Sequence, residues 1–214
     1  MTPDGKQTEV LEQGPFITEK EQQIFLEKYK LLLKNADIIV ASGSLPTNIN
    51  NNFYETLIQI ANNKGKMFLL DTSGITLKNG IAARPYSIKP NLAEMECYAQ
   101  CKIKNIKDAV TIIQLLGEKI TMPIISLGKE GAIVKYKGII YHVMPPKLSV
   151  VNAVGSGDAF MAGLAIGLTR KYDTQNVIKL VCACGAANVI QAESGYIAKD
   201  DVKAILENVI VERL

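Results

Sequence analysis

The chain has 214 residues, of which 48% are hydrophobic and 21% are charged, a balance typical of a folded globular protein with a sizeable core. This composition excludes a disordered chain. The 24 basic and 21 acidic residues give a net charge of +3, and the basic residues are scattered, with Arg170-Lys171 as their longest uninterrupted pair. A nucleic-acid-binding protein would gather them on a stripe, so nucleic acid is not an expected partner.

The sequence also argues against membrane insertion and secretion. Its most apolar stretch, residues 159–168, is about half as long as a membrane-spanning helix must be. The N-terminal residues 1–6 lack the apolar core of a secretory signal. We therefore expect a cytoplasmic protein with no membrane partner.

The cysteines and the one histidine give no sign of a metal or redox site. Cys97 and Cys101 are four residues apart, and Cys182 and Cys184 are two apart, so neither pair has the C-x-x-C spacing. We expect all four to be small buried hydrophobic side chains. His142 lies in a strand-like run and is interpreted as structural.

Short apolar runs, typical of buried strands, alternate along the chain with longer amphipathic runs, typical of helices. Thr18 and Glu21 have the spacing of a capping box that begins the first helix. Two alternating runs around Lys137-Gly138 predict a β-hairpin. In chain order we expect strands at 37–42, 67–71, 86–89 and 123–126, the hairpin at 132–143, and helices at about 18–32, 51–63, 92–100, 106–119, 157–170, 174–191 and 200–209.

The repetition of strand, helix and strand predicts an α/β fold of the doubly wound type. Its sheet would be mostly parallel with helices on both faces, because parallel strands need crossover connections. The continuously apolar run at 37–42 is expected to be buried on both faces. In such sheets the ligand site lies beyond the carboxyl ends of the strands, so polar clusters at strand ends are the candidates.

The first cluster immediately precedes the apolar helix expected at 157–170. Gly155, Ser156 and Gly157 would turn the backbone tightly and present amide N–H groups at the positive end of the helix dipole, which makes an anion site. Asp158 would lie in the first helical turn, where a carboxylate can act as general base for a hydroxyl that attacks phosphorus. The alternative is that Asp158 only stabilises the helix dipole and the glycines only form a loop.

The second cluster, Lys89-Pro90-Asn91 with Glu94, lies between a strand and a helix. Asn91 and Glu94 share a helix face and could reach a hydrated Mg²⁺, while Lys89 could reach a phosphate. Alternatively, Asn91 and Glu94 form a capping box. Both interpretations can hold at once.

Two weaker clusters follow other strands. Ser126, Gly128 and Gly131 lie between a strand and the hairpin, where a simple turn is the alternative interpretation. Ser42 and Gly43 follow the first strand, where a hydroxyl could bind sugar oxygens or a phosphate, although serine-glycine loops are common.

In this order and at these spacings, the clusters resemble the phosphofructokinase B family of ribokinase-like sugar kinases. Two of the matching segments, Asp4–Pro15 and Val151–Asp158, are most similar to the tagatose-6-phosphate kinase branch, with 1-phosphofructokinase next. The resemblance implies a ribokinase-like fold and the ATP- and Mg²⁺-dependent phosphorylation of a ketohexose phosphate, tagatose 6-phosphate to tagatose 1,6-bisphosphate, in carbohydrate catabolism. The matching segments are Asp4–Pro15, Ser42–Pro46, Lys89–Glu94, Ser126–Gly131 and Val151–Asp158.

The resemblance also implies roles for the matching residues. Asp158 would be the catalytic base that deprotonates the sugar hydroxyl, and the backbone of Gly155–Gly157 would be the anion hole for the migrating phosphoryl group. Ser42 and Gly43 would contact the sugar phosphate, and Glu94 would organise Mg²⁺ through water. The implied nucleotide-binding residues are Lys89, Asn91, Ser126, Gly128, Gly131, Asn152, Val154, Cys182 and Ala186.

The chain departs from the family pattern in two respects. Ala153 stands where this branch usually has proline, which alters only loop stiffness. The chain, one domain over 1–214, resembles the C-terminal two-thirds of a family member, so the first strands and most of the lid are expected to be missing and residues 1–15 are interpreted as a remnant of a lid strand. The alternatives to a tagatose-6-phosphate kinase are a 1-phosphofructokinase or a nucleotide-binding fragment without catalysis. Its partner would be a second copy, as in family members, or a complementing N-terminal chain.

Overall fold

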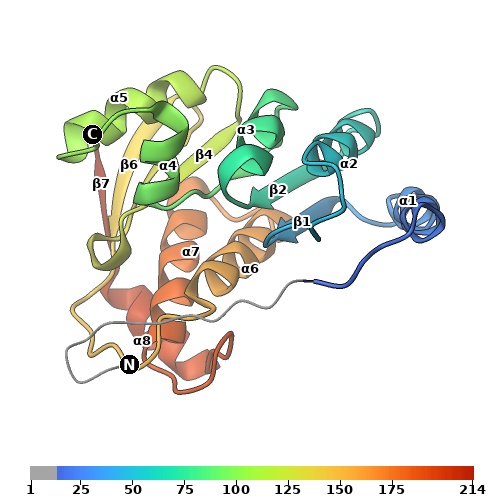
Figure 1. Cartoon of the computed structure of the whole chain (residues 1–214). Helices are drawn as coiled ribbons and strands as arrows, with labels where there is room; N and C mark the ends of the chain where they lie inside the picture. Colours follow the sequence, from blue (N-terminus) through green and yellow to red (C-terminus); the bar gives the residue numbers. More distant parts are fainter. Residues whose placement is uncertain (1–13) are drawn as a thin grey trace.

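A computed structural model describes residues 14–214, which form one seven-stranded sheet with helices on both faces (Figure 1). Of residues 1–15, interpreted above as a remnant of a lid strand, 1–13 lie outside the described residues. The strands follow one another across the sheet in chain order. They are β1 (Ile38–Ser42), β2 (Met67–Asp71), β3 (Ser87–Ile88), β4 (Met122–Ser126), β5 (Ala132–Tyr136), β6 (Ile139–Met144) and β7 (Ile210–Arg213).

The sheet is mixed, with its parallel part at the first-strand end. Strands β1 to β4 pair in parallel, whereas β5, β6 and β7 each pair antiparallel to the strand before. Strand β6 therefore runs in the same direction as β1 to β4, and the predicted mostly parallel α/β sheet is confirmed. The predicted hairpin is β5–β6, and its turn has positive φ at Lys137 (+52°) and Gly138 (+79°), as a two-residue hairpin turn of type I′ requires.

Two layers of helices bury the two faces of this sheet. The alternation of side chains along β2 illustrates this, because Leu69 packs into one core with α6 and α7, while Phe68 and Leu70 pack into the other with α2 and α3. All three side chains are fully buried. The helices are α1 (Glu19–Leu32), α2 (Phe53–Asn62), α3 (Gly74–Ala82), α4 (Leu92–Ala99), α5 (Ile106–Leu116), α6 (Ser156–Thr169), α7 (Thr174–Val189) and α8 (Lys199–Asn208).

Three sequence-based expectations need correction. Strand β1 is not buried on both faces, because Val40 is 44% exposed and, within residues 14–214, β1 pairs only with β2. Cys97 and Cys101 are exposed rather than buried, whereas Cys182 and Cys184 are buried as expected. Helix α3 and strand β7 were not predicted.

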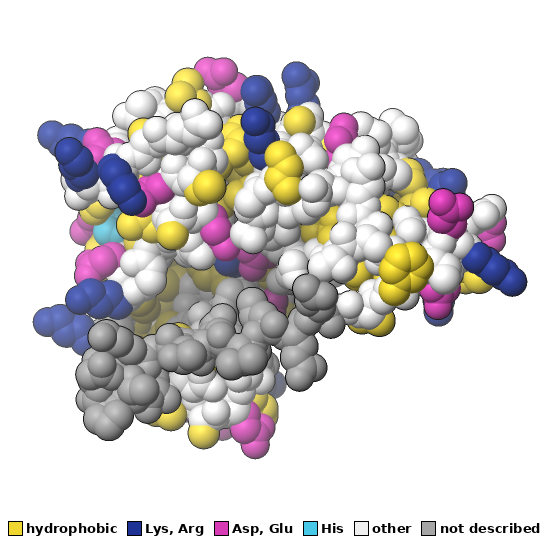
Figure 2. All heavy atoms as spheres, viewed as in Figure 1, with side chains coloured by type: hydrophobic (Ala, Val, Ile, Leu, Met, Phe, Trp, Pro, Cys, Tyr) yellow, Lys and Arg dark blue, Asp and Glu magenta, His cyan; other side chains and the backbone are white. Residues whose placement is uncertain are grey.

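The distribution of charge agrees with the sequence analysis. Figure 2 shows one face of the molecule, on which Lys and Arg side chains are interspersed with acidic ones rather than gathered on a stripe. Within the part of the chain that the structure describes, no helix has the length and apolar character needed to span a membrane.

Candidate active site

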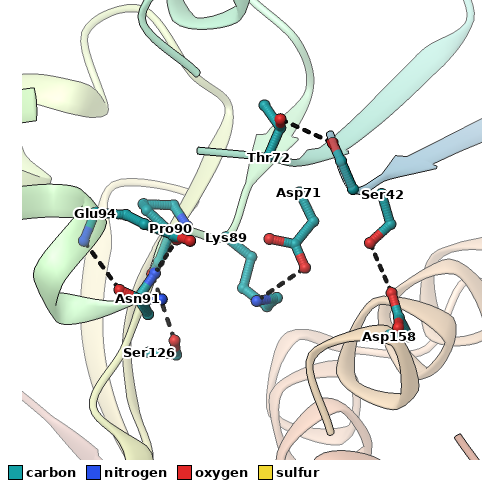
Figure 3. Close-up of polar contacts among 10 residues, drawn as sticks. Ser42, Asp71, Thr72, Lys89, Pro90, Asn91, Glu94, Ser126 and Asp158 are labelled. Carbon is teal, nitrogen blue, oxygen red and sulfur yellow. Dashed lines mark hydrogen bonds and ion pairs between the residues drawn. The ribbon is translucent and has the colours of Figure 1, made fainter. Parts of the chain in front are cut away.

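The parallel strands and the start of α6 bring three of the predicted residues, together with Asp71, to the carboxyl ends of the strands. Ser42 and Asp71 are the last residues of β1 and β2 and lie opposite each other in the pairing register, and Lys89 follows β3 directly. The first turn of α6, which carries Asp158, lies beside these strand ends (Figure 3). The rule that ligand sites form beyond the carboxyl ends of parallel strands therefore holds for the geometry of this chain.

An ion pair lies among the carboxyl ends of these strands. The Lys89 Nζ atom is 3.0 Å from Asp71 Oδ2, and the two side chains are only 8% and 16% exposed. Burial raises the pKa of Asp71, Lys89 partly offsets this effect, and the negative charge of Asp158 raises the pKa further. Two carboxylates and one ammonium group are thus close enough to influence one another.

The N-terminus of α6 is packed directly against this ion pair. A Cβ atom placed on Gly157 would be 3.3 Å from Lys89 Nζ and 3.4 Å from Asp71 Oδ2, so glycine leaves open the space between the helix and the pair. Gly155 begins the helix with φ at +84°, and a side chain there would collide with the backbone of Gly195. The predicted glycine turn is therefore confirmed as a backbone conformation.

Some of the amides at the start of α6 have no backbone acceptor within the described residues. Ser156 N–H donates to Ala153 O and Ala159 N–H donates to Gly155 O. Within residues 14–214, the N–H groups of Gly157 and Asp158 have no such acceptor. Unpaired amides at a helix N-terminus, beside a lysine ammonium, are the elements of a site for a phosphate-like anion.

Asp158 is exposed beside the carboxyl ends of the strands rather than turned into the core. Its Oδ1 atom accepts a hydrogen bond of 2.6 Å from the hydroxyl of Ser42. A carboxylate in this place can accept a proton from a ligand hydroxyl that approaches the amides. The structure therefore brings the first, second and fourth predicted clusters together.

The second cluster forms a capping box at the start of α4. Asn91 Oδ1 accepts from Glu94 N–H at 2.9 Å, and Glu94 Oε2 accepts from Asn91 N–H at 2.8 Å (Figure 3). The capping interpretation is thus confirmed, and both side chains are engaged in it. Within residues 14–214 there is no group of three or more His, Cys, Asp or Glu side chains able to hold a metal ion.

The third cluster lies beside the second. Ser126 N–H donates to Pro90 O at 3.0 Å, which joins the end of β4 to the loop before α4. Gly128 (φ +60°) and Gly131 (φ +84°) delimit a 3-10 turn over Gly128–Glu130. The carbonyl of Glu130 in this turn is 2.8 Å from His142 Nε2, which assigns the histidine a structural contact.

The remaining predicted residues lie around α7. Asn152 accepts from Val154 N–H and donates through Nδ2 to Ala192 O and to the hydroxyl of Ser194, which ties the loop before α6 to the loop after α7. Cys182 and Ala186 are buried in the core that α7 shares with α6, so only small parts of their surfaces face outward.

Sequence reasoning missed Asp71 and two hydroxyl groups beside it. Asp71 ends a predicted strand, as Ser42 does, so the strand-end rule alone was sufficient to find it. The hydroxyls of Tyr54 and Thr72 both contact the carbonyl of Gly43. No local pattern marks those two contacts, because their partner is a backbone atom distant in sequence.

Comparison with known proteins agrees with this geometry. Residues 1–200 match the pfkB family of carbohydrate kinases. The chain belongs to this family. A tagatose-6-phosphate kinase of Staphylococcus epidermidis is 36% identical over 97% of this chain and 68% of its own length.

Solved structures of the pfkB fold superpose on the described chain. A Staphylococcus aureus crystal structure, 28% identical, has a TM-score of 0.86 and is covered over 68% of its length by 98% of this chain. Phosphofructokinase-2 from Escherichia coli in complex with potassium, 23% identical, also gives a TM-score of 0.86, with 96% of this chain covering 67% of it. The ribokinase-like fold expected from the sequence is thereby confirmed.

Proposed function

We propose that this pfkB kinase transfers the γ-phosphoryl group of ATP to tagatose 6-phosphate and forms tagatose 1,6-bisphosphate. The relative of 36% identity supports this choice of substrate. The observation that carries the proposal is the position of Asp158. Its carboxylate lies next to amides of the α6 N-terminus that have no backbone acceptor within residues 14–214, and it faces the strand ends beside Lys89.

In the proposed reaction the sugar hydroxyl attacks the γ-phosphorus and its proton passes to Asp158. A bond forms between the hydroxyl oxygen and phosphorus, the bond from phosphorus to the bridging oxygen breaks, and ADP leaves with that electron pair. The backbone amides of Gly155 and Gly157, which have no backbone acceptor within residues 14–214, stabilise the negative charge on the migrating group, whereas the amide of Ser156 already donates to Ala153 O. Lys89 binds the phosphates as a fixed cation. Positioning and charge stabilisation are the main sources of rate in phosphoryl transfer.

The nucleotide is assigned to the side of the site where the second and third clusters meet. Mg²⁺ prefers octahedral oxygen ligands and retains several waters, so a carboxylate such as Glu94 fits an indirect role through water. The ion would neutralise phosphate charge. The residues proposed to border the nucleotide are Lys89, Asn91, Ser126, Gly128, Gly131, Asn152, Val154, Cys182 and Ala186.

The test is a coupled assay of ADP release with Mg-ATP and either tagatose 6-phosphate or fructose 1-phosphate. The proposal expects turnover with tagatose 6-phosphate at a higher kcat/KM than with fructose 1-phosphate. The reverse order would make the protein a 1-phosphofructokinase. Turnover with neither sugar, in the presence of measurable Mg-ATP affinity, would exclude both activities for the chain alone.

A second candidate is a nucleotide-binding unit that lacks catalysis by itself. It is favoured by the edge of β1 that has no strand partner within residues 14–214, by the 44% exposure of Val40, and by the third of the relative's length that the chain does not match. This candidate expects Mg-ATP binding by calorimetry and no sugar-dependent turnover until a complementing N-terminal segment is added. Turnover by the chain alone would exclude it.

A further inference from the structure

The backbone of Gly43, which follows Ser42, is held at both its N–H and its C=O. Gly43 N–H donates to Asp71 O at 2.9 Å, and Gly43 O accepts two hydrogen bonds, from Tyr54 Oη at 3.1 Å and from Thr72 Oγ1 at 2.9 Å. With φ at +99°, Gly43 has a conformation that side chains disfavour. The chain therefore leaves β1 in one fixed direction.

The two hydroxyl donors are themselves immobilised. Tyr54 is 7% exposed and lies on α2, and Thr72 is 5% exposed and directly follows β2. Buried side chains in a close-packed interior have few alternative rotamers. We call the arrangement of Tyr54, Thr72 and the Gly43 carbonyl the Gly43 clamp.

The clamp constrains Ser42, the residue just before Gly43. Ser42 donates its hydroxyl proton to Asp158 Oδ1 at 2.6 Å, although 116 residues separate the two in sequence. Ser42 and Asp158 are both exposed, so packing alone does not fix either side chain. The rigid backbone at Gly43 supplies the missing constraint.

We propose that Ser42, held by the Gly43 clamp, is a positioning residue that orients the Asp158 carboxylate and leaves its Oδ2 atom free for the attacking sugar hydroxyl. This inference rests on the proposed function. It gives Ser42 a role different from the sugar-phosphate contact that the family resemblance implies.

Proton counting favours this role. A serine hydroxyl has one proton to donate, and a phosphate at neutral pH offers oxygen acceptors. While the Ser42 proton lies on Asp158, Ser42 cannot donate to a substrate phosphate. The two roles therefore exclude each other for as long as the observed hydrogen bond persists.

The first test compares Ser42→Ala with Ser42→Thr in steady-state kinetics. A hydrogen bond to a charged group contributes enough that its loss lowers kcat by about 10- to 100-fold, and the KM for the sugar phosphate stays near its original value. Ser42→Thr retains the hydroxyl and restores most of the rate. A raised KM with unchanged kcat, or no effect of Ser42→Ala, would overturn the proposal.

The second test addresses the clamp and uses a matched control. Tyr54→Phe and Thr72→Val each remove one donor to Gly43 and are expected to lower kcat, with a larger fall in the double variant. Tyr29→Phe is the control, because the Tyr29 hydroxyl donates to the Leu57 carbonyl at 2.9 Å outside the site. Equal effects of Tyr54→Phe and Tyr29→Phe would overturn the clamp.

Crystal structures of the full chain and its Ser42→Ala and Thr72→Val variants decide the proposal independently of turnover. We expect Asp158 to adopt one rotamer in the parent chain and another rotamer, or several, in both variants. An unchanged Asp158 rotamer in both would contradict the positioning role. If the parent chain turned over no sugar phosphate, the proposed function would fail, and this structural comparison would still decide whether Ser42 orients Asp158.

Discussion

Glycine is the only residue that leaves room for an anion at position 157. A Cβ atom there would lie 3.3 Å from Lys89 Nζ, between the helix N-terminus and the buried ion pair. We expect Gly157→Ala to lower kcat/KM by about 100-fold, because a small displacement of the phosphoryl group is costly in a positioned reaction. Steady-state kinetics would measure this.

Gly167→Ala is the matched control, since Gly167 lies in the same helix and its added Cβ would be 3.3 Å from Val177 Cγ2. Both changes introduce a similar contact, but only the first lies at the site. Equal losses of activity would mean that Gly157 acts through the stability of α6 and not through the space beside Lys89.

The cysteines differ in environment, and this predicts their reactivity. Burial raises the pKa of the Cys182 thiol to about 12 and that of Cys184 to about 11, so little thiolate is present at pH 8. Cys97 and Cys101 are exposed. Titration of the native protein with a thiol reagent at pH 8 should modify Cys97 and Cys101 quickly and the buried pair only after denaturation. Rapid native labelling of Cys182 would contradict the burial of α7.

At the scale of single elements, the two capping boxes allow a direct comparison. Asn91 caps α4 and Thr18 caps α1 with the same pattern of bonds. Asn91→Ala and Thr18→Ala should each cost about 1 kcal/mol of stability, which thermal unfolding would measure. Asn91→Ala should also raise the KM for ATP, if Asn91 borders the nucleotide. If neither variant changed the KM for ATP, Asn91 would act only as a helix cap.

Most elements were predictable because their signals are local. Apolar runs, capping boxes and the Lys137-Gly138 turn predicted nearly all of the strands and helices. Helix α3 was missed because it begins at Gly74 with no side-chain cap and contains Gly80, whose lack of a Cβ matters only through its contact with Leu70 of β2. Strand β7 is short and mostly exposed, so its assignment depends on pairing with β6.

The burial of β1 was predicted wrongly for a related reason. A continuous apolar run indicates that a strand has apolar surroundings, but it does not identify the neighbour that provides them. In the described chain Val40 on β1 and Ile166 on α6 are 44% and 42% exposed, and the exposed side chains of α1 include Ile24 and Leu31. Figure 1 shows α1 set apart from the other helices, beyond β1.

For the whole molecule, the exposure of β1 predicts association. We expect β1, which pairs only with β2 within residues 14–214, to accept a parallel strand from a segment equivalent to the part of the Staphylococcus epidermidis relative that this chain does not match. Strands β1 to β4 are all parallel, and a strand edge without a partner presents unpaired backbone groups. Mixing the two chains should give a 1:1 complex in sedimentation analysis. Val40→Lys should weaken the complex, whereas Ile106→Lys, at a surface site on α5, should not. A complex insensitive to Val40→Lys would contradict docking at β1.

The sequence was sufficient to predict which residues gather at the candidate site, but not the contacts between them. The order of strand-end clusters was sufficient to place Ser42, Lys89 and Asp158 together. The Asp71–Lys89 ion pair depends on the register of β2 and β3, and the Gly43 clamp depends on how α2 packs beside the strand ends. Sequence spacing specifies neither.

Asp158 is proposed to remove the proton from the hydroxyl that receives the phosphoryl group. The most direct test is the kcat of Asp158→Asn with Mg-ATP and tagatose 6-phosphate, together with its affinity for Mg-ATP. Asparagine has nearly the same shape but cannot accept the proton, so kcat should fall by at least about 100-fold while nucleotide binding is largely retained. A variant that turns over at a rate close to that of the parent chain would contradict the claim.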